Sequence, residues 1–324
     1  ALYANTTGAS NTAVGTDTME ANTTGQMNVS VGANSLDANT TGNYNTGIGK
    51  SSLGANTTAH SNTAVGFSAL AANTTGDLNV AVGAYALTTS TTAANNTAVG
   101  YYSLNANTSG TSNAGLGYYA LSANTTGDQN TGIGYAALFS NTTADNNTAL
   151  GTLAMYSSTT GADNTAIGRY ALFANTTASY NTAVGSSALT ANTTGTPNTA
   201  VGCFALDSNT TAANNTGIGY DALAGATTGG SNTGIGHNAG KGITTATGNT
   251  AVGSYSNQAA CTGADNTSVG YYSLSANTSG AKNVAVGAES LDANTTGASN
   301  IAIGHSALTA ATTASSNTAV GKSA

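Results

Sequence analysis

One pattern of apolar and polar positions repeats along the whole chain. The motif Asn-Thr-Ala-Val-Gly, or a close variant, begins at Asn11 and recurs every 17 residues as far as Asn317, which gives 19 copies with no insertion or deletion between them. In most copies a Leu and then Asn-Thr-Thr-Gly follow the motif. Such a fixed period indicates units that stack in register, because a slip of one residue would turn every later side chain to the opposite face of a strand.

Each unit is predicted to form one coil of a parallel β-solenoid. Seventeen residues are few for a pair of helices, and the abundance of Thr, Val, Gly and Asn opposes helix formation. We therefore expect an all-β fold, a β-roll in which residues 1–324 make a single domain and Thr12–Gly15 and its equivalents are the strands. The chain begins and stops at the same phase of the repeat without a polar cap, so we expect a segment of a longer fibre or a subunit that stacks end to end.

Stacking allows the sequence to be read as 17 columns, each named here after one residue and containing every residue a multiple of 17 away. The Gly15 and Asn11 columns are invariant, which predicts a backbone turn that requires Gly and a ladder of stacked amides. The Val14 column is always Val, Ile or Leu and the Leu36 column is nearly always Leu, so both are predicted to form the core. The ladder residues that represent these columns are Asn11, Asn28, Asn45, Gly15, Gly32, Gly49, Val14, Val184, Leu36 and Leu189.

The Ala13 column is unusual because it never holds anything larger than Ser. Alternation along a strand places Ala13 on the face opposite Val14, so both faces of the strand are restricted. A solvent face would accept Lys or Glu in some of 19 coils. We therefore expect a second chain to cover the Ala13 face; the alternative is that this column lies at a cramped bend.

Composition narrows the possible functions. Only 5% of residues are charged, the formal net charge is −7, and five residues are Lys or Arg. This excludes an ordinary globular enzyme surface and argues against nucleic acid, whose phosphates require clustered cations. No stretch is long and apolar enough to predict a membrane span. All charged and aromatic residues fall in the columns of Asp77, Lys282, Arg169, Glu289 and Asp207, which are therefore predicted to form the outer surface.

The repeat resembles the head repeats of YadA-like trimeric autotransporter adhesins. It is more similar still to the NTAVGxxALxxNTTG repeats of bacterial surface proteins and phage tail fibres, with Asn11–Gly15 and Asn22–Gly25 as the plainest instance. The resemblance covers all 324 residues. It implies a left-handed β-roll assembled as a parallel homotrimer, which is exported and acts as a stalk or adhesive surface. The 17-residue unit is longer than the coil of the adhesin head.

Exposed tyrosines are the main candidates for a binding surface. They gather in successive coils and could contact a glycan, a neighbouring fibre or a host protein, or could simply stabilise the coils by stacking. The candidate binding residues are Tyr101, Tyr102, Tyr118, Tyr119, Tyr135, Tyr255, Tyr271 and Tyr272.

Other candidate chemistry is weaker. Asp128 and Asp145 share a column in adjacent coils and Asp163 lies one column over, so a hard cation could bridge them, although a plain acidic surface is the simpler interpretation. The Cys residues, Cys203 and Cys261, stand too far apart in the repeat to form a disulfide. Paired Thr residues raise ice binding as a further alternative, and the Asn-Thr-Thr/Ser sequons are interpreted as turns rather than glycan acceptors.

These observations together predict a non-enzymatic structural fibre or adhesin shaft that uses no cofactor. We expect it to be extracellular, on a cell surface or on a virion. Self-association as a homotrimer or end-to-end filament is expected. The alternative is a module that binds a surface or glycan through its tyrosines.

Overall fold

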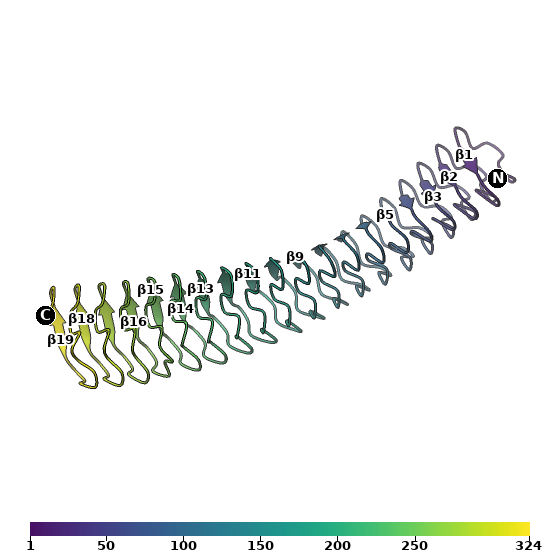
Figure 1. Ribbon diagram of the computed structural model, residues 1–324. Coiled ribbons are helices and arrows are strands. Elements are labelled where there is room, and N and C mark those ends of the chain that lie inside the picture. Colours follow the sequence, from purple (N-terminus) through teal and green to yellow (C-terminus); the bar gives the residue numbers. More distant parts are fainter. The chain divides into compact units, whose positions relative to one another are not determined.

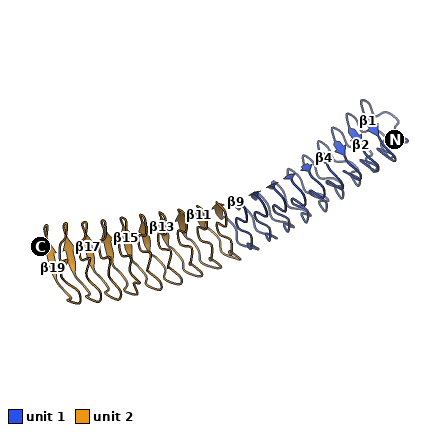
Figure 2. Cartoon of the chain, in the orientation of Figure 1, with its two compact units in different colours: residues 1–163 blue, residues 164–324 orange.

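The computed structural model describes residues 1–324, and its regular elements are 19 three-residue strands with no helix. The chain divides into two compact units, Ala1–Asp163 and Asn164–Ala324, which are coloured separately in Figure 2. The first unit contains β1 (Thr12–Val14), β2 (Val29–Val31), β3 (Thr46–Ile48), β4 (Thr63–Val65), β5 (Val80–Val82), β6 (Thr97–Val99), β7 (Ala114–Leu116), β8 (Thr131–Ile133) and β9 (Thr148–Leu150). The second contains β10 (Thr165–Ile167), β11 (Thr182–Val184), β12 (Thr199–Val201), β13 (Thr216–Ile218), β14 (Thr233–Ile235), β15 (Thr250–Val252), β16 (Thr267–Val269), β17 (Val284–Val286), β18 (Ile301–Ile303) and β19 (Thr318–Val320).

Within each unit every strand pairs in parallel with the equivalent strand of the next coil (Figure 1). The register advances by one repeat, so that Thr12 lies opposite Val29 and Thr182 lies opposite Thr199. Hydrogen bonds also join the non-strand parts of neighbouring coils, for example from Leu36 N to Ser52 O at 3.0 Å. The predicted all-β parallel solenoid with a 17-residue period is therefore confirmed.

The strand faces are the reverse of the predicted arrangement. The Ala13 column points inward and is buried in every strand from β2 to β18, whereas the Val14 column points outward and is only half-buried or exposed. The prediction that the Val14 column, including Val184, forms core is therefore wrong. The prediction that another chain covers the Ala13 face is wrong as well, because the opposite wall of the same coil covers it.

The narrowness of the coil decides which face is inside. A Cβ atom added to Gly47, in the Ala13 column, would lie 2.7 Å from Ser35 Oγ and 3.4 Å from Leu36 Cδ1. At the equivalent Gly234 it would lie 2.7 Å from Leu223 Cγ. Since the interior is already this crowded, only Gly, Ala or Ser fits there, and the larger aliphatic side chain must take the outer face.

The Leu36 column is core, as predicted. Leu36 and Leu189 are completely buried, and both have positive φ angles, 50° and 51° respectively. A branched Cβ is strongly disfavoured in this left-handed region, so the column holds Leu or Met in every coil except at Gly240 and Asn257, and never Ile or Val. The choice of Leu here is thus a backbone requirement as well as a packing one.

The Gly15 column turns the chain directly after each strand. Gly15 and Gly32 have φ angles of 137° and 129°. A Cβ on Gly15 would lie 2.8 Å from Gly32 O in the next coil, so both the backbone conformation and the close stacking require Gly, as predicted.

The two buried Asn columns make different ladders. In the Asn11 column the main bonds are to the backbone: Asn28 N donates to Asn11 Oδ1 at 2.9 Å, and Asn28 Nδ2 donates to Gly42 O at 2.8 Å. Amides bond directly at short distance in the Asn22 column instead, where Asn39 Nδ2 donates to Asn22 Oδ1 at 2.8 Å. The predicted amide stacking is therefore clearest in the column whose members start the Asn-Thr-Thr sequons.

Two successive coils of the second unit depart from the pattern. Gly240 stands where other coils have Leu, and a Cβ there would lie 2.7 Å from Leu223 Cδ2 and 3.1 Å from Ile243 Cδ1. Ile243 replaces the Asn of its column and is completely buried. An aliphatic side chain therefore still fills this part of the core, although it comes from a different position of the repeat.

In the following coil Cys261 has moved by one position. By count it belongs to the Thr6 column, yet Asn277 Nδ2 donates to its Sγ at 3.2 Å, so the thiol replaces the acceptor of an Asn. Thr262 supplies the hydroxyl bond of the Thr column, to Thr278 O at 3.2 Å. The 17-residue spacing is kept overall, but the chain inside this coil is locally displaced by one residue.

Candidate functional site

A continuous cluster of aromatic side chains lies on the outside of the first unit. Its members come from the two columns that follow the Gly15 turn and from the Asp207 column. The first aromatic cluster comprises Phe67, Tyr85, Tyr101, Tyr102, Tyr118, Tyr119, Tyr135, Phe139 and Tyr156. It includes all five tyrosines predicted for this region, and adds four rings from neighbouring coils.

The rings of this cluster contact each other mainly along the stacking direction. Tyr101 and Tyr118 are stacked with ring centroids 5.4 Å apart, and Tyr118 and Tyr135 are stacked at 5.6 Å with an interplanar angle of 4°. Tyr118 and Tyr119 meet edge to face at 4.4 Å. Because ring faces in the stack are covered by other rings, the cluster presents mostly ring edges and hydroxyl groups outward.

Electrostatics keeps these hydroxyl groups neutral. Loss of solvent raises the pKa of Tyr101 above the ordinary phenol value, and its neighbour Tyr102 adds to this effect. The pKa of Tyr119 is raised too, first by loss of solvent and then by its hydrogen bond with Tyr118. The cluster therefore offers uncharged hydrogen-bonding groups beside half-exposed rings.

The second unit carries a second aromatic cluster of similar construction. It joins the predicted Tyr255, Tyr271 and Tyr272 to Phe204, Tyr220 and His237. His237 is stacked on Tyr220 at 5.5 Å and meets Tyr255 edge to face at 5.0 Å. The imidazole thus acts as another member of the ring stack, a role that the sequence pattern did not indicate.

The three Asp residues considered for a cation have backbone partners instead. Asp128 Oδ1 accepts hydrogen bonds from Thr111 N at 2.6 Å and Thr111 Oγ1 at 3.0 Å. Asp145 Oδ1 accepts one from Asp128 N at 2.7 Å. Asp163 bonds to Asp145 through its backbone, and no group of three or more His, Cys, Asp or Glu side chains is placed to hold a metal ion. The carboxylates of Asp128 and Asp145 therefore join neighbouring coils.

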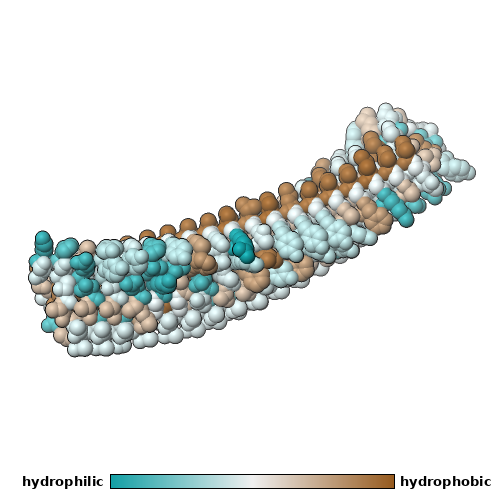
Figure 3. Space-filling model, viewed as in Figure 1, coloured by the Kyte–Doolittle hydropathy of each residue, from teal (hydrophilic) through white to brown (hydrophobic).

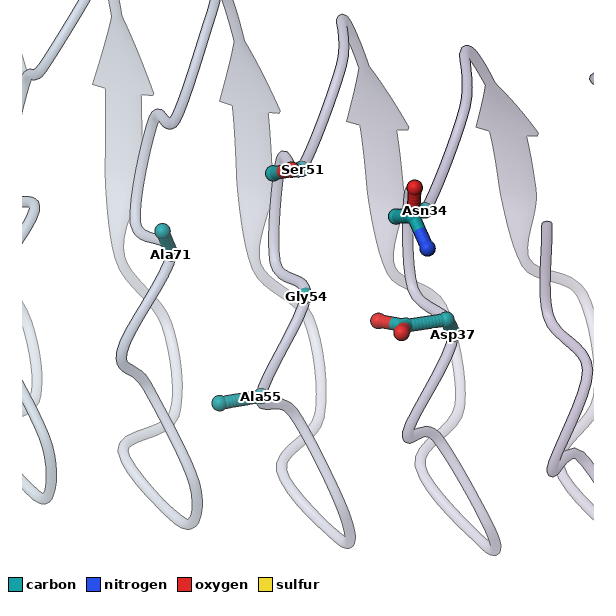
Figure 4. A pocket seen from close by; sticks show the side chains of 6 residues that line it. All are labelled: Asn34, Asp37, Ser51, Gly54, Ala55 and Ala71. Carbon is teal, nitrogen blue, oxygen red and sulfur yellow. The ribbon is translucent and has the colours of Figure 1, made fainter. Parts of the chain in front are cut away.

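Two open grooves lie beside the Asp207 column, one on each unit. The groove in the first unit is lined by Asn34, Asp37, Ser51, Gly54, Ala55 and Ala71, and Figure 4 shows that these residues belong to three neighbouring coils. Burial raises the pKa of the Asp37 carboxyl. In the second unit the equivalent groove contains Asp221, paired with Lys241 at 2.6 Å. Ser208 Oγ, in the same groove, donates to Asp207 Oδ1 at 3.3 Å.

The remaining candidate residues, the paired Thr, the sequon Asn and the two Cys, take part in the fold itself. In the Thr6 column Thr23 Oγ1 donates to Thr40 O at 3.0 Å, so this hydroxyl is already used between coils. Asn22, in the sequon column, is completely buried, so the folded coil does not present its amide for glycosylation. Cys203 and Cys261 are both free thiols, in agreement with the expected absence of a disulfide, and burial raises the pKa of Cys261.

The comparisons with known proteins do not extend this description. No family model matches the chain, and no curated protein is significantly similar to it. The chain also contains no helix of the length and hydropathy that a membrane crossing requires.

Proposed function

We propose that this chain is a structural, non-enzymatic segment of an extracellular fibre or adhesin shaft. One observation carries the proposal: nearly every polar column is used to join a coil to the next, through backbone rungs, Asn ladders and Thr hydroxyls. Such nearest-neighbour bonding gives a stability that accumulates with each added coil and transmits load along the stack.

The resemblance to adhesin head and tail-fibre repeats supports the same function. On that basis we propose a left-handed β-roll that assembles as a parallel homotrimer and is displayed on a cell surface or virion. The low charge and the predominance of Thr, Asn and Gly suit a surface that repels few neighbouring copies.

Immunogold electron microscopy tests this function directly. Antibodies raised against the purified chain should label filaments or projections on the outside of the source cells or particles. Labelling confined to the cell interior would contradict the shaft. Purified protein should also appear as thin rods under negative stain, and compact globular particles would contradict the fibre role.

A binding module is the second candidate, and the exposure of its aromatic rings favours it. Tyr118 and Tyr135 expose 44% and 51% of their surface within the first aromatic cluster. Replacing Tyr118 and Tyr119 by Ala should reduce binding to a glycan array or host-cell layer, while Thr126→Ala with Thr143→Ala, at exposed positions in nearby coils, should not. Equal binding of both double variants would leave only the scaffold role.

A further inference from the structure

The outward-facing aliphatic residues form a continuous row on each unit. This outer row consists of the Val14 column, from Val14 to Val320, and Figure 3 shows part of it as a line of brown side chains. It includes residues that are more than a third exposed, such as Ile48, Val99 and Ile218. Next to it on the same strand face is the Thr12 column, which contains Thr, Val, Ile or Ala only.

The column of Tyr101 has an exposure similar to that of the outer row but a different composition. Exposure to water alone therefore does not account for the aliphatic composition of the outer row. Val99 is 37% exposed and Tyr101, two residues later, is 40% exposed. The column of Tyr101 also holds Lys50 and Arg169, as a solvated position would, whereas all 19 members of the outer row are Val, Ile or Leu. No polar residue occurs at this outward position in any of the 19 coils. The uniformity indicates a surface that is covered in the assembled protein.

The dimensions of the row are of the order of a chain-to-chain interface. The Thr12 and Val14 columns lie about 6.7 Å apart along a strand, and coils repeat about every 4.8 Å, so the uncharged strip covers about 290 Å² on the nine strands of the first unit and about 320 Å² on the ten of the second. The two strips together supply about three quarters of the roughly 800 Å² that each partner contributes to a stable protein interface.

A second copy of this chain is the occupant that fits the row. Close packing of side chains along so many coils requires a partner whose side chains repeat at the same spacing, because any other period falls out of step within a few coils. An identical solenoid has that spacing by construction. A charged partner would find nothing complementary in the strip, since none of the chain's 17 charged residues lies in these two columns.

We propose that copies of this chain associate side by side through the outer row, so that the Val14 and Thr12 columns of neighbouring copies bury each other. This inference rests on the proposed shaft function and names the surface that joins its chains. It assigns to the outer strand face the contact that the sequence pattern had placed on the Ala13 face.

The test compares two triple variants of the whole chain by analytical ultracentrifugation. In the row variant Val184, Ile218 and Val252 are replaced by Lys in alternate coils, which keeps the new charges apart. In the control variant the same number of charges is added at exposed positions of the same region, by Thr177→Lys, Thr211→Lys and Thr245→Lys. Circular dichroism establishes that each variant is folded.

The wild-type chain and the control variant should sediment at a multiple of 31.2 kDa, and the row variant at that single-chain mass. Wild-type chain that remains a single copy would overturn the inference, as would a row variant that still associates or a control variant that also dissociates. If the row variant does not fold, replacing the same three residues by Thr preserves shape and should weaken association at least tenfold. Single-chain wild-type rods labelled outside cells would overturn this inference while leaving the shaft function intact.

Discussion

The interior Leu36 column and the outer row are both aliphatic in nearly every coil, yet they occupy opposite environments. Leu189 is completely buried, whereas Val184, five residues earlier, lies on the outside. The difference arises from the width of the coil, which admits one large side chain and a facing Ala. Uniform hydrophobicity therefore marks a covered position, but does not say whether the cover is the same chain or another one.

The largest expected effect comes from placing a charge in the interior Leu36 column and, for comparison, in the outer row. Leu189→Asp buries an unpaired carboxylate and should cost more than about 4 kcal/mol of unfolding free energy in its coil. Val184→Asp leaves its carboxylate in water in a single copy, so the coil should stay folded while association weakens. Hydrogen exchange of the surrounding coils measures the first effect and sedimentation the second. Equal loss of protection in both variants would contradict the assigned faces.

Removing one Asn of the Asn11 column should have the next largest effect. Asn215→Ala would leave Asn232 N without the acceptor that Asn215 Oδ1 supplies at 2.8 Å. Gly229 O would lose the donor Asn215 Nδ2 at 2.9 Å and keep Asn232 Nδ2 at 3.2 Å. One buried N–H without a partner should cost about 1 to 3 kcal/mol of unfolding free energy, measured by chemical denaturation. Thr211→Ala, at an exposed position, is the matched control and should change stability little. A neutral Asn215 variant would mean that the ladder does not stabilise the coil.

A change of shape without a change of volume sharpens the comparison further. Leu189→Ile places a branched Cβ at a φ of 51° and should cost about 1 to 2 kcal/mol. Val184→Ile lies in extended strand, so it should leave the thermal midpoint almost unchanged. If both variants are equally stable, the backbone requirement inferred for the Leu column is incorrect.

The smallest expected effect concerns the half-buried Asp37 beside its groove. Burial raises the pKa of this carboxyl, so the folded state binds a proton more readily than the unfolded chain. Stability contributed by Asp37 should therefore be greatest in acid and decrease as the pH rises from its unfolded pKa through its higher folded pKa. Asp37→Asn should raise the thermal midpoint relative to wild type at pH 7 and lose that advantage at pH 3. An advantage that is independent of pH would contradict this assignment.

Much of the fold could be predicted because the repeat samples each position many times. The period, the parallel pairing, the Gly15 turn and the burial of the Leu36 column all followed from columns that tolerate few residue types. The aromatic clusters were found in part, since only Tyr residues in the densest coils were singled out, while Phe139 and Tyr156 join through a different column. His237 was missed because a single imidazole gives no pattern of its own.

The sequence by itself determined that identical coils stack in register and that the Ala13 and Val14 columns are both restricted. Only the tertiary structure decided which of them faces inward, because alternation fixes opposite faces but not their direction. The deciding quantity is the space between the two walls of a coil, where even one added Cβ meets Leu or Ser atoms at short distance. The displaced Cys261 illustrates the same point. The count of 17 residues sets the spacing of coils, whereas local packing sets which residue points inside.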